Sequence, residues 1–320
     1  MKEPFIKQVP FDPSCEYESE LMATIASTIK DNPNDLFIKR SDPLYKETEK
    51  LHRAYFGNNT SQVIKQKLVS IIIQQTEMTL IIIGVDSYLL TLPEVAAELE
   101  RRNFTGKLHL VIIDPLQDEL QKESAEITAN KGIIGNIQVV CAKVETLNPK
   151  QWHAIHECPG KKIVFANFSL HYILPSRRMF FLKTLKQFTD GIFMVERDLN
   201  LLGQPKDTAI RLTWNHFLPL YKIIGTCNAR HDEKRVLYNW FGMLVRDALN
   251  ESTQVVCTHL CESIEQWKTK LKKAGFDISN DVNYLSPGEE PKPGICFFPL
   301  HQTSGSKETF LACIISNLTI

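Results

Sequence analysis

Two uninterrupted apolar runs most constrain how this chain can fold. Residues 80–83 form the first run, which ends at Gly84, and residues 108–113 form the second, which ends at Asp114. A run without polar alternation predicts a strand that is buried on both faces, as in a parallel sheet. Residues 93–100, between the runs, carry proline and glutamate where the first turn of a helix favours them. The stretch therefore predicts a strand–helix–strand unit.

The residues that follow the two runs suggest a nucleotide half-site. Gly84 permits a tight turn and a close approach of the backbone to a ligand. Asp114 places carboxylate oxygens at the end of a second parallel strand, where a ribose diol can be bound. The plainer alternative is an ordinary buried unit in which Asp114 and Pro115 form only a turn. No G-x-G-x-x-G motif follows the first run.

The alternation of strand and helix continues along the chain. Three more strands and three more helices are predicted over residues 136–142, 162–168 and 191–196, and over residues 117–131, 148–156 and 177–188, respectively. Five such units predict an α/β protein with a doubly wound, Rossmann-like parallel sheet and right-handed crossovers. Residues 295–300 and 309–317 predict an antiparallel pair that closes the sheet. Ligands of such sheets bind outside the carboxyl ends of the strands.

Two helical regions flank or interrupt this pattern. Helices predicted over residues 19–30, 41–56 and 61–75 make residues 1–75 an N-terminal helical cap, although they would equally pad one face of the sheet. Residues 76–320 are predicted to be the Rossmann-like domain, with a helical insertion at about residues 201–260. The insertion is rich in aromatic residues and is placed to cover the site, but helical aromatic residues more often belong to a core.

The charge balance and the absence of long apolar segments limit the classes of partner that we expect. The chain has 37 lysine and arginine residues and 37 aspartate and glutamate residues, so it has no overall positive charge that would attract nucleic acid. We therefore expect no nucleic-acid partner. No apolar run reaches the length of a membrane span, and the N-terminus does not resemble a secretory signal. We therefore expect no membrane association, a cytoplasmic location and a small-molecule partner, with a protein partner also compatible.

The 8 cysteines are scattered and contain no CxxC motif, which favours a reducing compartment. Cys257, His259 and Cys261 have a spacing that zinc accepts, but further ligands are not evident, and no metal site is predicted. Three cysteines lie in apolar runs and are predicted to be small core residues: Cys141, Cys296 and Cys313.

The order of elements resembles that of class I S-adenosylmethionine-dependent methyltransferases. Residues 262–276, with Trp267 and the Ala274-Gly275-Phe276 end, resemble the "W…AGF" helix before the terminal hairpin of many of them. Residues 167–174 resemble their fourth-strand motif with its "LHH(I/L)L" tail. With residues 195–198 at the fifth strand, these features also look like the GRAS family, whose members have a methyltransferase-like fold. The resemblance covers residues 60–320.

This resemblance implies S-adenosylmethionine as the cofactor. Gly84 would face its methionine part, Asp114 its ribose hydroxyls, and the turn at residues 142–145 its adenine, while residues 167–171 would line the reacting side. The residues expected to bind the cofactor are Gly84, Asp86, Ser87, Asp114, Pro115, Ala142, Lys143, Val144, Asn167 and Phe168.

Two residues are the candidates for catalysis. His171 is the predicted base, because imidazole titrates near neutrality, and its alternative is a histidine that packs on the following helix. Glu196 would orient an amine or hydroxyl acceptor, or would pair structurally with Arg197 or Arg230. The residues expected to bind the methyl acceptor are Tyr55, Tyr88, Tyr172, Arg197 and Trp214.

Two functions of different classes follow from these features. The first is a methyltransferase that acts on a small molecule, which Asp114 and the capped site favour. The second is a catalytically inactive methyltransferase-fold protein that serves as a regulatory or protein-interaction module, as plant GRAS proteins regulate transcription. Asp86 and Tyr88 favour the second, because they stand where the usual loop has its second and third glycines, and Ile82 replaces the usual acid. The missing phosphate-binding glycines disfavour a nicotinamide-dependent oxidoreductase.

Overall fold

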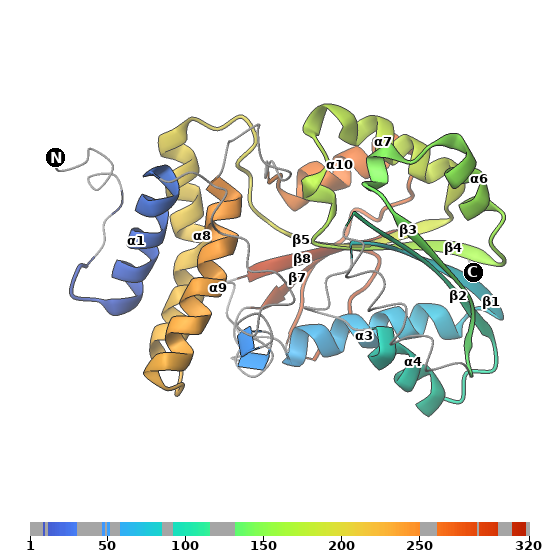
Figure 1. The fold of residues 1–320 in the computed structure, drawn as a ribbon, viewed down its shortest axis with the longest axis horizontal. Helices are drawn as coiled ribbons and strands as arrows, with labels where there is room; N and C mark the ends of the chain where they lie inside the picture. The colour runs from blue at the N-terminus through green and yellow to red at the C-terminus, as the bar shows by residue number, and fades with distance from the viewer. Residues whose placement is uncertain are drawn as a thin grey trace.

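The computed structural model describes residues 9, 12–30, 47–48, 50–51, 58–84, 92–115, 132–249, 261–286, 288–299 and 309–317. These residues form one sheet of eight strands in the order β3-β2-β1-β4-β5-β8-β7-β6 (Figure 1). The strands are β1 Glu77–Ile83, β2 Lys107–Asp114, β3 Ile134–Cys141, β4 Lys161–Asn167, β5 Gly191–Arg197, β6 Val282–Tyr284, β7 Gly294–Pro299 and β8 Thr309–Ile315.

Strand direction divides the sheet into a parallel part and a closing part. Strands β1 to β5 run parallel to one another. Strand β8 lies antiparallel between β5 and β7, and β6 pairs parallel with β7. This arrangement confirms the predicted α/β fold with a doubly wound sheet and an antiparallel end. The short strand β6 was not predicted, because its residues carry no apolar run.

Burial follows position in the sheet. Strand β1 lies between β2 and β4, and every one of its residues after Glu77 is buried, which explains its unbroken apolar sequence. Strand β3 forms the edge, and most of its side chains are exposed or half-buried. Cys141 is exposed there, so its prediction as a core residue was wrong. Cys296 and Cys313 are buried, as predicted.

Helices cover both faces of the sheet (Figure 1). Helices α6 (Pro149–His156), α7 (Pro175–Phe188) and α10 (Ile264–Ala274) lie on one face, and α3 (Asn58–Ile73) and α4 (Leu92–Arg101) lie on the other. Alternate residues of β1 supply the two cores: Ile81 and Ile83 pack with the first group, whereas Leu80 and Ile82 pack with the second.

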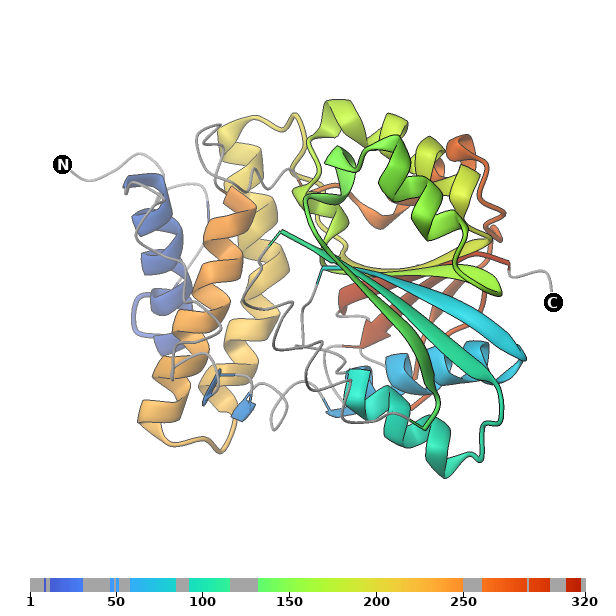
Figure 2. The ribbon, with the colours of Figure 1, turned by 45° about the vertical axis from the view of Figure 1, so that its right-hand side comes forward.

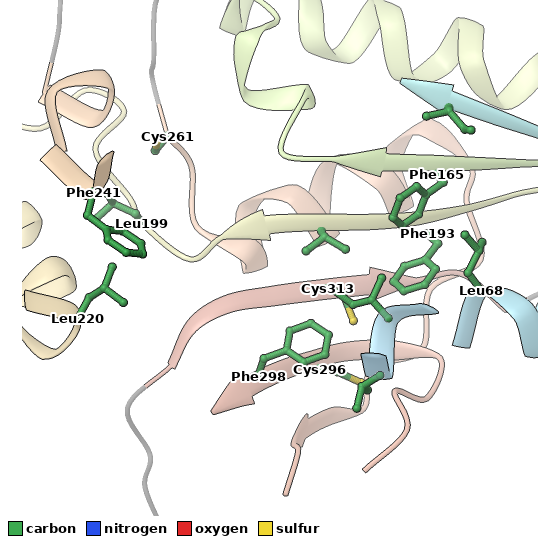
Figure 3. Packing of buried hydrophobic residues seen from close by; sticks show 14 of the residues in the cluster. Leu68, Phe165, Phe193, Leu199, Leu220, Phe241, Cys261, Cys296, Phe298 and Cys313 are labelled. Atoms are coloured by element: carbon green, nitrogen blue, oxygen red, sulfur yellow. The ribbon is translucent and has the colours of Figure 1, made fainter. Parts of the chain in front are cut away.

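Three further helices form a layer beside the sheet. Helix α1 (Glu16–Lys30) packs on α8 (Lys206–Thr226) and α9 (His231–Leu249). The carboxyl ends of the parallel strands point toward this layer (Figure 2). One buried cluster runs from Phe165 and Phe193 in the sheet to Leu199, Leu220 and Phe241 (Figure 3). The insertion is therefore part of a core that continues from the sheet.

The described helices of the predicted N-terminal cap lie in two different places. Helix α1 joins the layer of α8 and α9, and α3 covers the sheet together with α4. The helices predicted over residues 41–56 and 117–131 fall largely or wholly outside the described residues. A separate domain at residues 1–75 stays a prediction. None of the helices in the described part of the chain is long and apolar enough to cross a membrane.

Candidate functional site

The strand order creates a switch point between β1 and β4. From β1 the chain continues to β2 on one side, whereas β4 lies on the other side of β1. Ile83 at the end of β1 is in register with Ala166, one residue before the end of β4. In open α/β sheets, ligands bind at the carboxyl edge where the winding reverses in this way. The residues after β1, β2 and β4 therefore form the candidate site.

Gly84 turns the chain at the end of β1 in a conformation that favours glycine. Its φ is +81°, and a Cβ atom placed on it would lie 2.8 Å from the Cβ of Ser169. Its amide N–H donates to the carbonyl of Ile113 at 2.9 Å, which ties the turn to the end of β2. The ends of β1, β2 and β4 are thus fixed together at one edge of the sheet.

Asp114 is the last residue of β2 and is 7% exposed. Its main-chain carbonyl accepts the amide N–H of Ala142 at 3.1 Å, so the turn after β3 lies next to it. In that turn Lys143 is exposed and Val144 is buried. Pro115 is exposed, and its carbonyl lies 3.6 Å from the Cys141 sulfur. The predicted ribose and adenine residues are therefore neighbours.

A polar turn follows β4. Asn167 and Ser169 are both buried, at 2% and 9% exposure, and Phe168 between them has a left-handed φ of +48°. The N–H of Phe168 donates to the carbonyl of Val195 at 3.0 Å, which holds this unusual backbone against β5. Among the described residues, the Ser169 hydroxyl has no hydrogen-bond partner. Buried polar atoms of this kind usually have one.

His171 and Glu196 form a buried pair. The His171 Nδ1 lies 2.8 Å from Glu196 Oε2, and the amide N–H groups of Leu170 and His171 donate to Oε1 at 3.0 and 3.4 Å. Burial lowers the pKa of His171, and the carboxylate offsets this only in part. Burial acts to raise the pKa of Glu196, but His171, its hydrogen bonds and the charge of Arg197 lower it overall. We infer a neutral imidazole held by an ionised carboxylate.

Arg178 is a buried cation that holds the segment after this turn. The Arg178 Nε and Nη2 donate to the carbonyls of Ile173 and His171, each at 2.8 Å. Its Nη1 donates to Glu262 at 2.6 Å, and Glu262 also binds Lys270. The guanidinium lies 4.9 Å from the centre of the Trp267 ring. The segment after β4 is therefore held rigidly from the side of α7 and α10.

Arg197 ends β5 and is 5% exposed. Its guanidinium carbon lies 5.8 Å from the centre of the Phe168 ring. The sequence left open a structural pair of Glu196 with Arg197 or Arg230, but Glu196 pairs with His171, and Arg230 pairs with Asp232 and Glu233. Of the remaining candidates for acceptor binding, Trp214 is buried in α8, and Tyr172 is exposed beside the His171 ring.

The structure brings many of the predicted residues together and adds others. Asp86, Ser87, Tyr88 and Tyr55 lie outside the described residues, as do Cys257 and His259. Within the described ranges, no group of three potential metal ligands is found. Sequence reasoning missed Arg178, Glu262 and His216, because partners distant in sequence give these side chains their roles.

The sequence matches no protein-family model and no curated protein. Among solved structures, SCL7 of Oryza sativa, a GRAS protein, is similar with a TM-score of 0.68 at 11% identity, over 96% of this chain and 90% of that one. The small RNA methyltransferase HEN1 gives a TM-score of 0.46 at 11% identity, over 82% of this chain and 26% of that one. PigF with SAH gives 0.40 at 14% identity, over 81% and 64%. The chain has a class I methyltransferase fold and resembles its GRAS-like branch.

Proposed function

We propose that this protein binds S-adenosylmethionine at the carboxyl ends of β1, β2 and β4 and transfers its methyl group to a small-molecule acceptor. One observation carries the proposal. Three buried polar side chains, those of Asp114, Asn167 and Ser169, flank the left-handed Gly84 at the switch point of the sheet. Polar side chains gathered at the carboxyl edge of such a switch point are typical of a ligand site.

The residues at this edge fit the chemical groups of the cofactor. The carboxylate of Asp114 only accepts hydrogen bonds, as two ribose hydroxyls require. The turn of Ala142, Lys143 and Val144 would flank the adenine, with the buried Val144 as its apolar member. Gly84, Asp86 and Ser87 would receive the methionine part. The unpartnered Ser169 hydroxyl, next to Gly84 among the described residues, is a further contact that this ligand would satisfy.

Bound S-adenosylmethionine would supply an electrophilic methyl group. The chain then has to hold the acceptor in line and exclude water. The rigid turn of Asn167, Phe168 and Ser169 would set the acceptor's position. If the acceptor must lose a proton, His171 is the base that we propose, because Glu196 holds its Nδ1 and thereby favours the tautomer with the lone pair on Nε2.

A second candidate function is a regulatory or protein-interaction module without catalysis. The side chains of Asp86 and Tyr88, in place of loop glycines, favour it. Under either function we propose no nucleic-acid partner, because the 37 basic and 37 acidic residues leave no overall positive charge. The scattered cysteines support a cytoplasmic location.

Calorimetric titration with S-adenosylmethionine and S-adenosylhomocysteine tests the first function. We expect both to bind, and Asp114→Asn to weaken both by roughly 10- to 100-fold, since it removes a charged acceptor of hydrogen bonds. The matched control is Asp207→Asn, because Asp207 is exposed on α8. No heat and no thermal shift at millimolar ligand would contradict cofactor binding and favour the module.

A further inference from the structure

Arg197 is a buried cation, and two of its guanidinium nitrogens have no hydrogen-bond acceptor among the described residues. Its Nε and Nη1 are fully buried, and neither has a hydrogen-bond partner in the described part of the chain. A guanidinium stays charged at all physiological pH values. Burial of such a charge is unfavourable unless it is paired and hydrogen-bonded. The Phe168 ring, 5.8 Å from the guanidinium carbon, is an apolar neighbour and offers no anion.

The nearest carboxylate in sequence, that of Glu196, does not form an ion pair with Arg197. Successive side chains of a strand point to opposite faces, so Glu196 and Arg197 leave β5 in opposite directions. Glu196 accepts from Leu170 and His171 on the α7 side. Within the described ranges, no carboxylate lies within ion-pair distance of Arg197. Arg197 therefore has no ion-pair partner among the described residues, and its charge is felt by Glu196 only at longer range, where it helps to lower the pKa of that carboxyl group.

Arg197 lies next to the turn that we propose positions the methyl acceptor. Val195, two residues earlier and on the same face, packs in the cluster that includes Trp214 and Phe217 of α8. The pKa of His216 on α8 is lowered to about 3, first by burial and then by the charge of Arg197. His216 is thus neutral at pH 7, and Arg197 carries the positive charge between the end of β5 and α8. Phe168 links it directly to the turn that would position the acceptor.

We propose that Arg197 binds an acidic group of the methyl acceptor, so that the substrate class is a small organic acid with an apolar or aromatic body beside Phe168. The proposal deepens the methyltransferase function and rests on it. A carboxylate accepts hydrogen bonds only and supplies the missing counterion. A phosphate group has the same complementary chemistry, and the test separates the two. Asn200, whose side-chain oxygen also has no partner within the described residues, lies three residues further along the chain.

Benzoate and benzamide are the probes that test the charge at constant shape. Both are added to the full-length protein saturated with S-adenosylhomocysteine and followed by ligand-observed NMR, with inorganic phosphate as a third arm. The variants are Arg197→Met, which keeps the volume and removes the charge, and Arg197→Lys, which keeps the charge. Arg211→Met is the control, because Arg211 is an exposed arginine of α8. A fragment of this size binds at best weakly, so millimolar concentrations are used.

We expect benzoate to bind, benzamide to bind roughly 10- to 100-fold more weakly, and Arg197→Met to lose the difference. Arg211→Met should behave as the unaltered protein. Phosphate binding that depends on Arg197, with no binding of benzoate, would overturn the carboxylate assignment. Equal binding of benzoate and benzamide, or benzoate binding that survives Arg197→Met, would overturn the anion site.

The two proposals fail separately. If S-adenosylhomocysteine binds and benzoate binding is the same in Arg197→Met as in the unaltered protein, only the anion site is overturned. If S-adenosylhomocysteine does not bind, benzoate is titrated into the ligand-free protein instead. Benzoate binding that depends on Arg197, without any binding of S-adenosylhomocysteine, supports the anion site and contradicts the methyltransferase.

Discussion

Arg178 and Arg197 are both buried near the carboxyl ends of β4 and β5, yet their surroundings differ. Each of the three guanidinium nitrogens of Arg178 donates a hydrogen bond, one of them to Glu262. Two of the three nitrogens of Arg197 have no acceptor among the described residues. Arg178 lies on the side of α7 and α10, and Arg197 lies on the side of α8. Within the described residues, the arginine on one face of the sheet thus has an acceptor for each guanidinium nitrogen, whereas the arginine on the other face lacks acceptors for two of them.

The difference separates a structural charge from a functional one. A buried arginine that serves the fold must find its counterion within the chain, since nothing else is always present. A buried arginine that serves a ligand retains donors that only the ligand satisfies, and the fold bears the cost in its absence. On this criterion we propose that Arg178 serves the fold and that Arg197 serves a ligand.

Replacement of Arg178 is expected to have the largest effect. Arg178→Met removes the ion pair with Glu262 and three hydrogen bonds, and should lower the free energy of unfolding by about 3–5 kcal/mol. Chemical denaturation measures it. Arg177→Met is the control on the same helix, because Arg177 is exposed. Equal stability of the two variants would show that Arg178 is not structural and would remove the contrast with Arg197.

The sheet could be predicted from the sequence because its information is local. Each parallel strand is an unbroken apolar run, and topology then places the strand ends, with Gly84 and Asp114, at one edge. The edge position of β3 could not be predicted, since it depends on strand order, and Cys141 was therefore misplaced. The pair of Arg178 and Glu262 joins residues 84 positions apart, and no local pattern indicates it. The contrast between the two arginines is likewise a property of packing.

His171 and His216 lie near the two arginines, and the pH dependence of stability that they cause is expected to be an effect of intermediate size. The pKa of His216 is lowered from 6.5 to about 3, so below pH 6.5 the unfolded chain binds a proton that the folded chain does not. The stability from His216 is therefore complete above pH 6.5 and is lost as the pH falls. Between pH 7 and pH 5 the loss is about 2 kcal/mol. His216→Gln should reduce the loss by that amount, as measured by denaturation at both pH values.

The pKa of His171 is lowered as well, so some loss in acid remains in the His216→Gln variant. Arg197→Met should also reduce the loss, though less than His216→Gln does, because burial is the larger cause of the His216 shift. An unchanged pH dependence in both variants would contradict the placement of Arg197 toward α8.

Gly84→Ala probes the ligand edge itself and should cost about 1–2 kcal/mol of stability. The cost has two parts: the left-handed φ of +81°, and the contact of the new Cβ with Ser169. Gly288 has a φ of +82° with nothing within 4 Å of an added Cβ, so Gly288→Ala measures the first part alone. We expect Gly84→Ala to be the more destabilising of the two and, unlike Gly288→Ala, to weaken binding of S-adenosylhomocysteine. Identical losses would show that β1 and β4 do not meet closely at this edge.

The smallest effect is expected where the two arginines differ most. Arg197→Met removes a buried charge that has no ion-pair partner among the described residues and fills its place with an apolar chain, so the stability of the ligand-free protein should be unchanged or rise by up to about 1 kcal/mol. The same substitution at Arg178 is expected to be strongly destabilising, and the two variants measured side by side give the contrast directly. A loss of more than about 1 kcal/mol in Arg197→Met, comparable to a lost hydrogen bond or more, would mean that Arg197 serves the fold. With a saturating anion, the unaltered protein should become the more stable of the two, because the bound anion stabilises it by mass action and does not stabilise Arg197→Met.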